Sequence, residues 1–194
     1  MTPLAQHPTT AIWFVAGYLA FFCLCLSVVS ALNWPVATGV LDWGRKLVLG
    51  PALLALIWYD VREYRLPDLI TLPLIFSGLA FAWLDGGQTE LFFALIAVTL
   101  GYGLIWGVGK AWTALRGAPG IGLGDAKLLA AGGAWCGLLN LPLLITLASG
   151  AGLLIAFFVA RFDKNKRIVP SAVIPFGLAL APAIWVLECL TRSN

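Results

Sequence analysis

The stretch Gly120-Ile121-Gly122-Leu123-Gly124-Asp125 is the feature around which this sequence is arranged. Glycine occupies every second position, and Asp125 follows the third glycine. An apolar segment rich in alanine and leucine comes next, at residues 126–131. Glycine permits backbone conformations and close approaches that are closed to other residues. An acidic residue at the mouth of an apolar membrane helix is costly and is usually functional. We therefore expect Asp125 to act with a partner elsewhere in the chain.

The composition predicts an all-α, polytopic membrane protein. The chain has 194 residues, of which 61% are hydrophobic and 11% are charged, and its mean hydropathy is +0.94. Soluble domains carry about 25% charged residues. Because one span needs about 20 apolar residues, the chain has room for about seven transmembrane helices and little else. We expect a single membrane domain over residues 1–194, in contact with the lipid bilayer.

The polar residues argue against several other kinds of function. The net charge is only +3 and the basic residues are scattered among short loops, so no nucleic-acid partner is expected. The four cysteines lie inside apolar segments without a C-x-x-C pair, and His7 is the only histidine. This pattern indicates neither a metal site nor a disulfide framework, and no cofactor is expected.

Apolar segments separated by polar turns define the expected spans. They cover residues 11–32, 44–60, 67–84, 90–108, 125–139, 142–160 and 170–190. The first segment contains Val29-Ser30-Ala31, which is similar to a signal-peptide cleavage site. However, no lysine or arginine precedes it, and the apolar run is longer than a usual signal-peptide core. We expect 11–32 to be retained as an extra N-terminal span beside a core over residues 44–190.

Lysine and arginine are distributed unevenly between the two sides of the predicted membrane. Nine lie on the side of the glycine stretch, and three lie on the other side. The nine are Arg62, Arg65, Lys110, Arg116, Lys127, Arg161, Lys164, Lys166 and Arg167, and the three are Arg45, Lys46 and Arg192. Cytoplasmic loops are enriched in basic residues. The glycine stretch is therefore expected to face the cytoplasm.

Asp60 is the second acidic residue that stands apart. It ends the apolar run 53–59, whereas the other acidic residues except Asp125 fall in turns or at helix ends. The span over 44–60 travels inward and ends at Asp60, and the helix expected at 125–139 starts from the same side. Both carboxylates are therefore expected near one membrane face at similar depth. The sequence leaves open whether they meet or are two unrelated helix-end carboxylates.

If the two carboxylates do meet, their chemistry is specific. Two carboxylates a few ångströms apart in a low dielectric do not both ionise, so one keeps a proton. The ionised member can take a proton from water while the protonated member donates a hydrogen bond to a peptide carbonyl, as in aspartyl proteases. Because Asp125 is expected to start a helix and Asp60 to end one, the helix dipoles favour Asp60 as the protonated member.

Two motifs around these aspartates resemble those of the type IV prepilin peptidases. Tyr59-Asp60-Val61-Arg62-Glu63-Tyr64-Arg65-Leu66-Pro67-Asp68-Leu69-Ile70-Thr71-Leu72-Pro73-Leu74 is similar to the first motif of that family. The run from Gly122-Leu123-Gly124-Asp125 to Trp135 is similar to the second, the GxGD motif that presenilins share more loosely. Pro175-Phe176-Gly177 is similar to a third recurring element.

The resemblance implies an intramembrane aspartyl peptidase with a six-helix core. It implies that Asp60 and Asp125 are the catalytic pair and that Gly122 and Gly124 shape the active-site loop. The family cleaves the leader peptide of prepilins or pseudopilins, just before their hydrophobic N-terminal helix. Cleavage takes place on the cytoplasmic side of the bacterial inner membrane, which is the side that the lysine and arginine distribution predicts.

The chain departs from the family pattern in one respect. Many members carry an N-terminal cytoplasmic domain with two C-x-x-C pairs and methylate the new N-terminus of the pilin. Here the segment between the first two spans has about 11 residues and no cysteine. We therefore expect a short member with peptidase activity, and the pattern does not favour N-methyltransferase activity.

Two alternatives use the same residues differently. A small proton-coupled transporter would use Asp60 and Asp125 as a relay, and a scaffold subunit of a secretion machine would leave both replaceable. The expected position of both carboxylates near one face, and the lack of a visible inverted repeat, favour the peptidase. A phosphate cradle at the glycine stretch is disfavoured because Ala118-Pro119 precedes it in place of a strand and because Asp125 would repel phosphate.

Overall fold

The fold is all-α within the part of the chain that the structure describes, as the composition predicts. This computed structural model describes residues 40–63, 65–117, 122–162 and 177–191. The helices are α2 (Val40–Glu63), α3 (Asp68–Arg116), α4 (Leu123–Cys136), α5 (Leu141–Phe162) and α6 (Gly177–Thr191). Several predicted features lie outside these residues, namely the span at 11–32, the start of the span at 170–190, and Gly120 and Ile121 of the glycine stretch.

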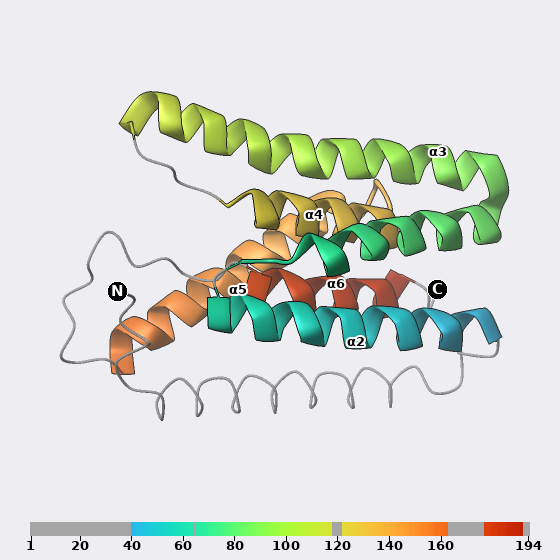
Figure 1. Cartoon of the computed structure of the whole chain (residues 1–194), viewed down its shortest axis with the longest axis horizontal. Coiled ribbons are helices and arrows are strands. Elements are labelled where there is room, and N and C mark those ends of the chain that lie inside the picture. Colours follow the sequence, from blue (N-terminus) through green and yellow to red (C-terminus); the bar gives the residue numbers. More distant parts are fainter. Residues whose placement is uncertain (1–39, 64, 118–121, 163–176, 192–194) are drawn as a thin grey trace.

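Helix α3 is a hairpin of two helical arms. Its backbone is non-helical at Gly87, where φ is 65° and ψ is −140°, a region that favours glycine. The two arms fold back on each other at this point (Figure 1). The reversal falls within the turn that the sequence predicts at residues 85–89, between the expected spans 67–84 and 90–108. The second arm ends at Gly117, whose φ is 69° and whose N–H donates to the Thr113 carbonyl at 2.8 Å.

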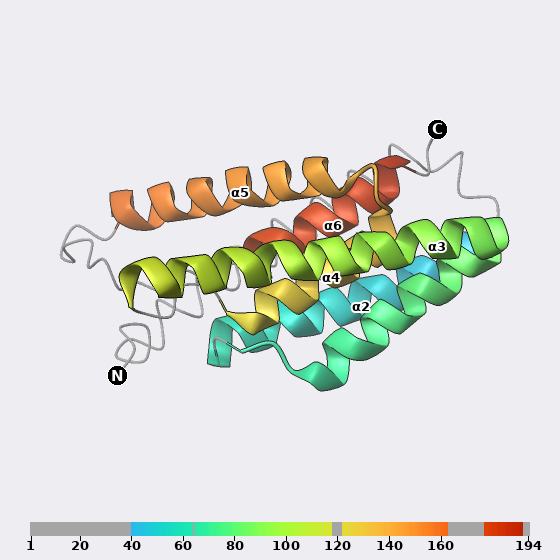
Figure 2. The ribbon, with the colours of Figure 1, turned by 90° about the horizontal axis from the view of Figure 1, so that it is seen from above.

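Helix α4 lies in the middle of the bundle, with both arms of α3, α5 and α6 around it (Figures 1 and 2). Ten of its residues are buried: Ala126, Leu128, Leu129, Ala130, Ala131, Gly132, Gly133, Ala134, Trp135 and Cys136. A Cβ at Gly133 would lie 2.7 Å from the carbonyl oxygen of Ala97 in α3, so the two backbones are in contact there. Small residues permit such close helix packing in membranes. Residues 130–134 of α4 are all alanine or glycine, which allows this approach.

One side-chain hydrogen bond fixes α4 against the first arm of α3. The indole Nε1 of Trp135 donates to the carbonyl oxygen of Leu74 at 2.8 Å, and both residues are buried. Beside it, a Cβ at Gly78 would lie 2.8 Å from the Trp135 ring, so the ring fills the space that this glycine leaves. A polar group buried in this way needs its partner, so the bond sets the rotation of α4.

Among the described helices, α3 is long and apolar enough to cross a membrane. Shorter apolar stretches occupy Leu141–Ile155 and Gly177–Thr191. Large apolar side chains on α3 are exposed, among them Phe76 (68%) and Phe92 (61%), as expected for a surface that lipid covers. The seven-span topology and the single domain over 1–194 remain predictions.

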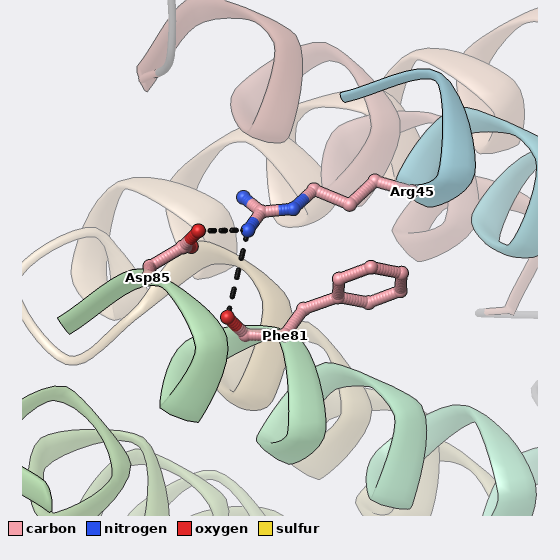
Figure 3. A network of polar contacts seen from close by, with 3 residues as sticks. All are labelled: Arg45, Phe81 and Asp85. Atoms are coloured by element: carbon pink, nitrogen blue, oxygen red, sulfur yellow. Dashed lines mark hydrogen bonds and ion pairs between the residues drawn. The ribbon is translucent and has the colours of Figure 1, made fainter. Parts of the chain in front are cut away.

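A partly buried ion pair joins α2 to the bend of α3. Arg45 is 1% exposed, and its Nη2 contacts the Asp85 carboxylate and the Phe81 carbonyl oxygen (Figure 3). Its guanidinium carbon also lies 5.1 Å from the centroid of the Phe81 ring. Arg45 is one of the three basic residues on the predicted outer side. Asp85 therefore compensates the charge of this buried guanidinium.

Candidate functional site

Asp60 lies in the last turn of α2 and is 4% exposed. Its carboxylate faces the first residue of α6, because a Cβ at Gly177 would lie 2.6 Å from Asp60 Oδ2. The backbone N–H groups of Gly177 and Leu178 are directed at this carboxylate. Farther along, Gly50 in α2 approaches Trp185 in α6, so the two helices run antiparallel. The N-terminus of α6 therefore packs against the C-terminal end of α2, where Asp60 lies.

Asp125 lies in the first turn of α4, where its backbone N–H donates to the Gly122 carbonyl at 3.2 Å. It is half-buried, and it is close enough to Asp60 for the two charges to interact. The structure thus brings together the two aspartates that the sequence singles out. Their position at the C-terminal end of α2 and the N-terminal end of α4 matches the expectation that both lie near one face.

The two glycines predicted to shape the loop differ in their surroundings. A Cβ at Gly124 would lie 3.0 Å from Leu66 Cδ1, 3.2 Å from Leu66 Cβ and 3.5 Å from the Leu66 backbone nitrogen. At Gly122, the nearest side-chain atom to such a Cβ would be Asp125 Oδ2, at an ordinary distance of 3.7 Å. Gly124 is therefore the glycine that close packing requires. It lets the 65–67 segment lie directly on the turn that carries Asp125.

An ion pair also joins the two segments that carry the aspartates. Lys127 Nζ lies 2.5 Å from Asp68 Oδ1. Lys127 is two residues beyond Asp125, and Asp68 opens α3 after the short connection from α2. The side chains are 27% and 58% exposed, so solvent screens the pair and its contribution to stability is small. The pair shows that the N-termini of α3 and α4 lie beside each other.

Gly177 is the site residue whose contact the sequence does not predict. We expected 170–190 to be one span, which would place Gly177 in its interior. Gly177 was singled out only as part of the recurring family element Pro175-Phe176-Gly177. The described helix α6 begins at Gly177. The C-terminal end of α2 favours the protonated form of Asp60, as expected from the sequence. The N-terminus of α6 acts on the same carboxylate in the opposite direction.

The described side chains give this site a limited chemical repertoire. No group of three or more histidine, cysteine, aspartate or glutamate residues in the described ranges could hold a metal ion. What the arrangement provides is a pair of interacting carboxylates, one of them facing backbone amides, beside a tightly packed glycine turn. Such a pair can exchange protons with water and a bound carbonyl group.

Comparison with known proteins identifies the family of this chain. The sequence matches the Type IV leader peptidase family over residues 47–157, a region that contains both aspartates. This chain belongs to the type IV leader peptidase family. The resemblance noted from the two motifs is therefore confirmed.

Several relatives carry the name prepilin leader peptidase/N-methyltransferase. The protein of Aeromonas salmonicida (strain A449) is 38% identical over 161 residues, which are 83% of this chain and 53% of the relative. The protein of Neisseria gonorrhoeae is 39% identical over 141 residues, 73% of this chain and 46% of the relative. The protein of Escherichia coli (strain K12) is 35% identical over 164 residues, 84% of this chain and 69% of the relative.

The chain spans about half the length of most of these leader peptidase relatives. The family match at 47–157 contains the two aspartates, all of α4 and most of α2, α3 and α5. No solved structure matches the fold of this chain.

Proposed function

We propose that this protein is a membrane-embedded aspartyl endopeptidase that cleaves the leader peptide of type IV prepilins or pseudopilins. The observation that carries the proposal is the approach of Asp60 and Asp125, which come from the ends of two different helices to one partly buried site. Membership of the type IV leader peptidase family and the names of the relatives support the reaction and the substrate.

The proposed reaction uses the pair of carboxylates to activate water. One carboxylate is ionised and takes a proton from a water molecule, whose oxygen then bonds to the scissile carbonyl carbon. The other is protonated and donates its proton toward the carbonyl oxygen. Burial favours a single shared charge because two ionised carboxylates would repel each other in a low dielectric.

The proposed location is the bacterial inner membrane, with several spans and with the site facing the cytoplasm. The support is the excess of lysine and arginine on the side of Asp60 and Asp125. The partners are then the lipid bilayer and the leader and hydrophobic helix of the substrate. We do not propose N-methyltransferase activity.

The test is cleavage of a prepilin in membranes by wild type, Asp60→Asn and Asp125→Asn. Each change is near-isosteric and removes the carboxylate, so each is expected to lower the rate at least 1,000-fold, as loss of a residue of a catalytic unit does. Glu90→Gln is the matched control because Glu90 is exposed beyond the bend of α3. It is expected to cleave at the wild-type rate.

Two outcomes would contradict the proposal. If either aspartate variant still cleaves at a substantial rate, that residue is structural. If wild type inserts into the membrane and cleaves no prepilin or pseudopilin, the substrate assignment fails, and the transporter or scaffold alternatives regain support.

A further inference from the structure

We propose that the N-terminus of α6 makes Asp60 the proton acceptor of the pair and leaves Asp125 as the member that carries the proton. Gly177 and Leu178 are then positioning residues for the reaction. The inference rests on the proposed peptidase function and adds an assignment within the same site. It reverses the expectation from the helix ends alone, which placed the proton on Asp60.

The first observation is the close contact at Gly177. A Cβ there would lie 2.6 Å from Asp60 Oδ2 and 3.1 Å from its Cγ. Real side chains essentially never approach so closely, so any residue other than glycine would displace the carboxylate. Gly177 itself is buried. The carboxylate therefore lies directly on the first backbone turn of α6.

The second observation is the buried state of the carboxylate. Asp60 is 4% exposed, and Oδ2 has no hydrogen-bond partner among the described residues. A buried carboxylate needs donors to hold its charge. The N–H groups of Gly177 and Leu178 are directed at it, and they belong to the end of a helix where the dipole favours an anion. Burial disfavours the charge of Asp60, and these amides offset part of that cost, so Asp60 ionises more readily than an equally buried carboxylate without donors.

Asp125 lacks the equivalent support. Burial and then the charge of Asp60 both disfavour its ionised form, and no hydrogen bond from the described residues offsets them. The nearby cations have other contacts, since Arg62 lies 4.3 Å from the centroid of the Trp58 ring and Lys127 is paired with Asp68. When only one carboxylate is ionised, the charge remains on the one with amide donors.

The steps of the reaction then follow with their protons assigned. Asp60 takes a proton from water as the water oxygen bonds to the carbonyl carbon, and Asp125 gives its proton to the carbonyl oxygen. The C–N bond then breaks as Asp60 passes its proton to the leaving amine, and the hydroxyl proton returns to Asp125. The pair ends in its starting state, with Asp60 ionised and Asp125 protonated.

The test compares the pH dependence of prepilin cleavage by Gly177→Ala and Gly150→Ala. The added methyl group meets Asp60 in the first variant, whereas no atom lies within 4 Å of it in the second. In Gly177→Ala the acid limb of the kcat/KM profile is expected to move to higher pH, because Asp60 is harder to ionise without its donors. At low pH the loss is expected to be about ten- to hundred-fold, the effect of one hydrogen bond to a charged group.

A second pair of variants covers the case in which Gly177→Ala does not fold. Leu178→Pro removes one amide donor at a first-turn position where helices tolerate proline. Leu178→Ala removes the same side chain and keeps the donor. The proline variant is expected to shift the acid limb, and the alanine variant is expected to keep it in place.

The outcomes separate this inference from the proposed function. If wild type cleaves and the Gly177→Ala or Leu178→Pro profile keeps the wild-type acid limb, the inference is wrong and the peptidase assignment stands. A uniform loss at every pH would make α6 a structural element only, which also contradicts the inference. If wild type does not cleave, the proposed function itself fails.

Discussion

At the scale of single residues, the glycines before Asp125 separate into two roles. Both Gly122 and Gly124 were predicted to shape the loop, on the basis of the motif. The structure gives the tight contact to Gly124 alone, against Leu66. The reason is that residue 124 faces the connection between α2 and α3, which spacing along the sequence does not reveal.

Gly124→Ala is expected to lower the cleavage rate several-fold, and Gly122→Ala is expected to lower it less. The new methyl group at position 124 must displace Leu66 by a few tenths of an ångström, which shifts the turn that carries Asp125. A misplacement of catalytic groups on this scale slows a reaction measurably. The measurement is the initial rate of prepilin cleavage per amount of folded protein.

Leu66→Ala in the Gly124→Ala background provides the control for this mechanism. It removes Cδ1, the atom at 3.0 Å, and should restore part of the rate. If the fold-losses in rate of the two single variants multiply in the double variant, the contact with Leu66 is not the cause of the loss.

At the scale of helices, the packing of α4 depends on the absence of side chains. Gly133→Ala is expected to destabilise the protein by about 1–3 kcal/mol, because the methyl group would overlap the backbone of α3. Gly107→Ala in α3 is the matched control, since no atom lies within 4 Å of its added methyl group. Thermal unfolding in detergent should show a lower Tm for the first variant and an equal or higher Tm for the second. Equal Tm values would show that the α3–α4 interface has room.

The sequence predicts the helices better than it predicts their contacts. Local pattern predicts the turn at 85–89. The order of the spans predicts that Asp60 and Asp125 lie near one face. The contact of Asp60 with Gly177 and the pairing of Arg45 with Asp85 follow from neither. Both join residues far apart in the chain, so they depend on how whole helices pack.

At the scale of the molecule, the charges at the far end of α2 are separate from the candidate site. Arg45 lies fifteen residues before Asp60, or about 22 Å along a helix that rises 1.5 Å per residue. The ion pair with Asp85 therefore stabilises the bend of α3 without contact with the reaction. This arrangement predicts that stability and activity respond differently to changes there.

Asp85→Asn is expected to destabilise the protein by about 1–3 kcal/mol and to leave the cleavage rate per folded molecule unchanged. The buried guanidinium of Arg45 would lose its anion, and breaking a buried pair is strongly destabilising. The Asp85 side chain is 26% exposed, so water offsets part of the loss. Tm and the initial rate are the two measurements, with Glu90→Gln as the control for charge at that end.

Replacing both partners supplies the complementary result. Arg45→Met with Asp85→Leu is expected to recover most of the lost stability, since apolar substitutes avoid an unpaired buried charge. If Asp85→Asn lowers the rate per folded molecule as well as the Tm, the two ends of the molecule are coupled.

The central position of α4 has a consequence for how the protein is made. With 14 residues, α4 is about 21 Å long, shorter than the hydrocarbon core of about 30 Å. Its buried residues contact α3, α5 and α6, and the last two of these helices are synthesised after it. During biosynthesis, α4 therefore lacks some of its packing partners until α6 has left the ribosome. We expect its insertion to finish after translation of the core, so that the two aspartates meet only when the whole bundle has assembled.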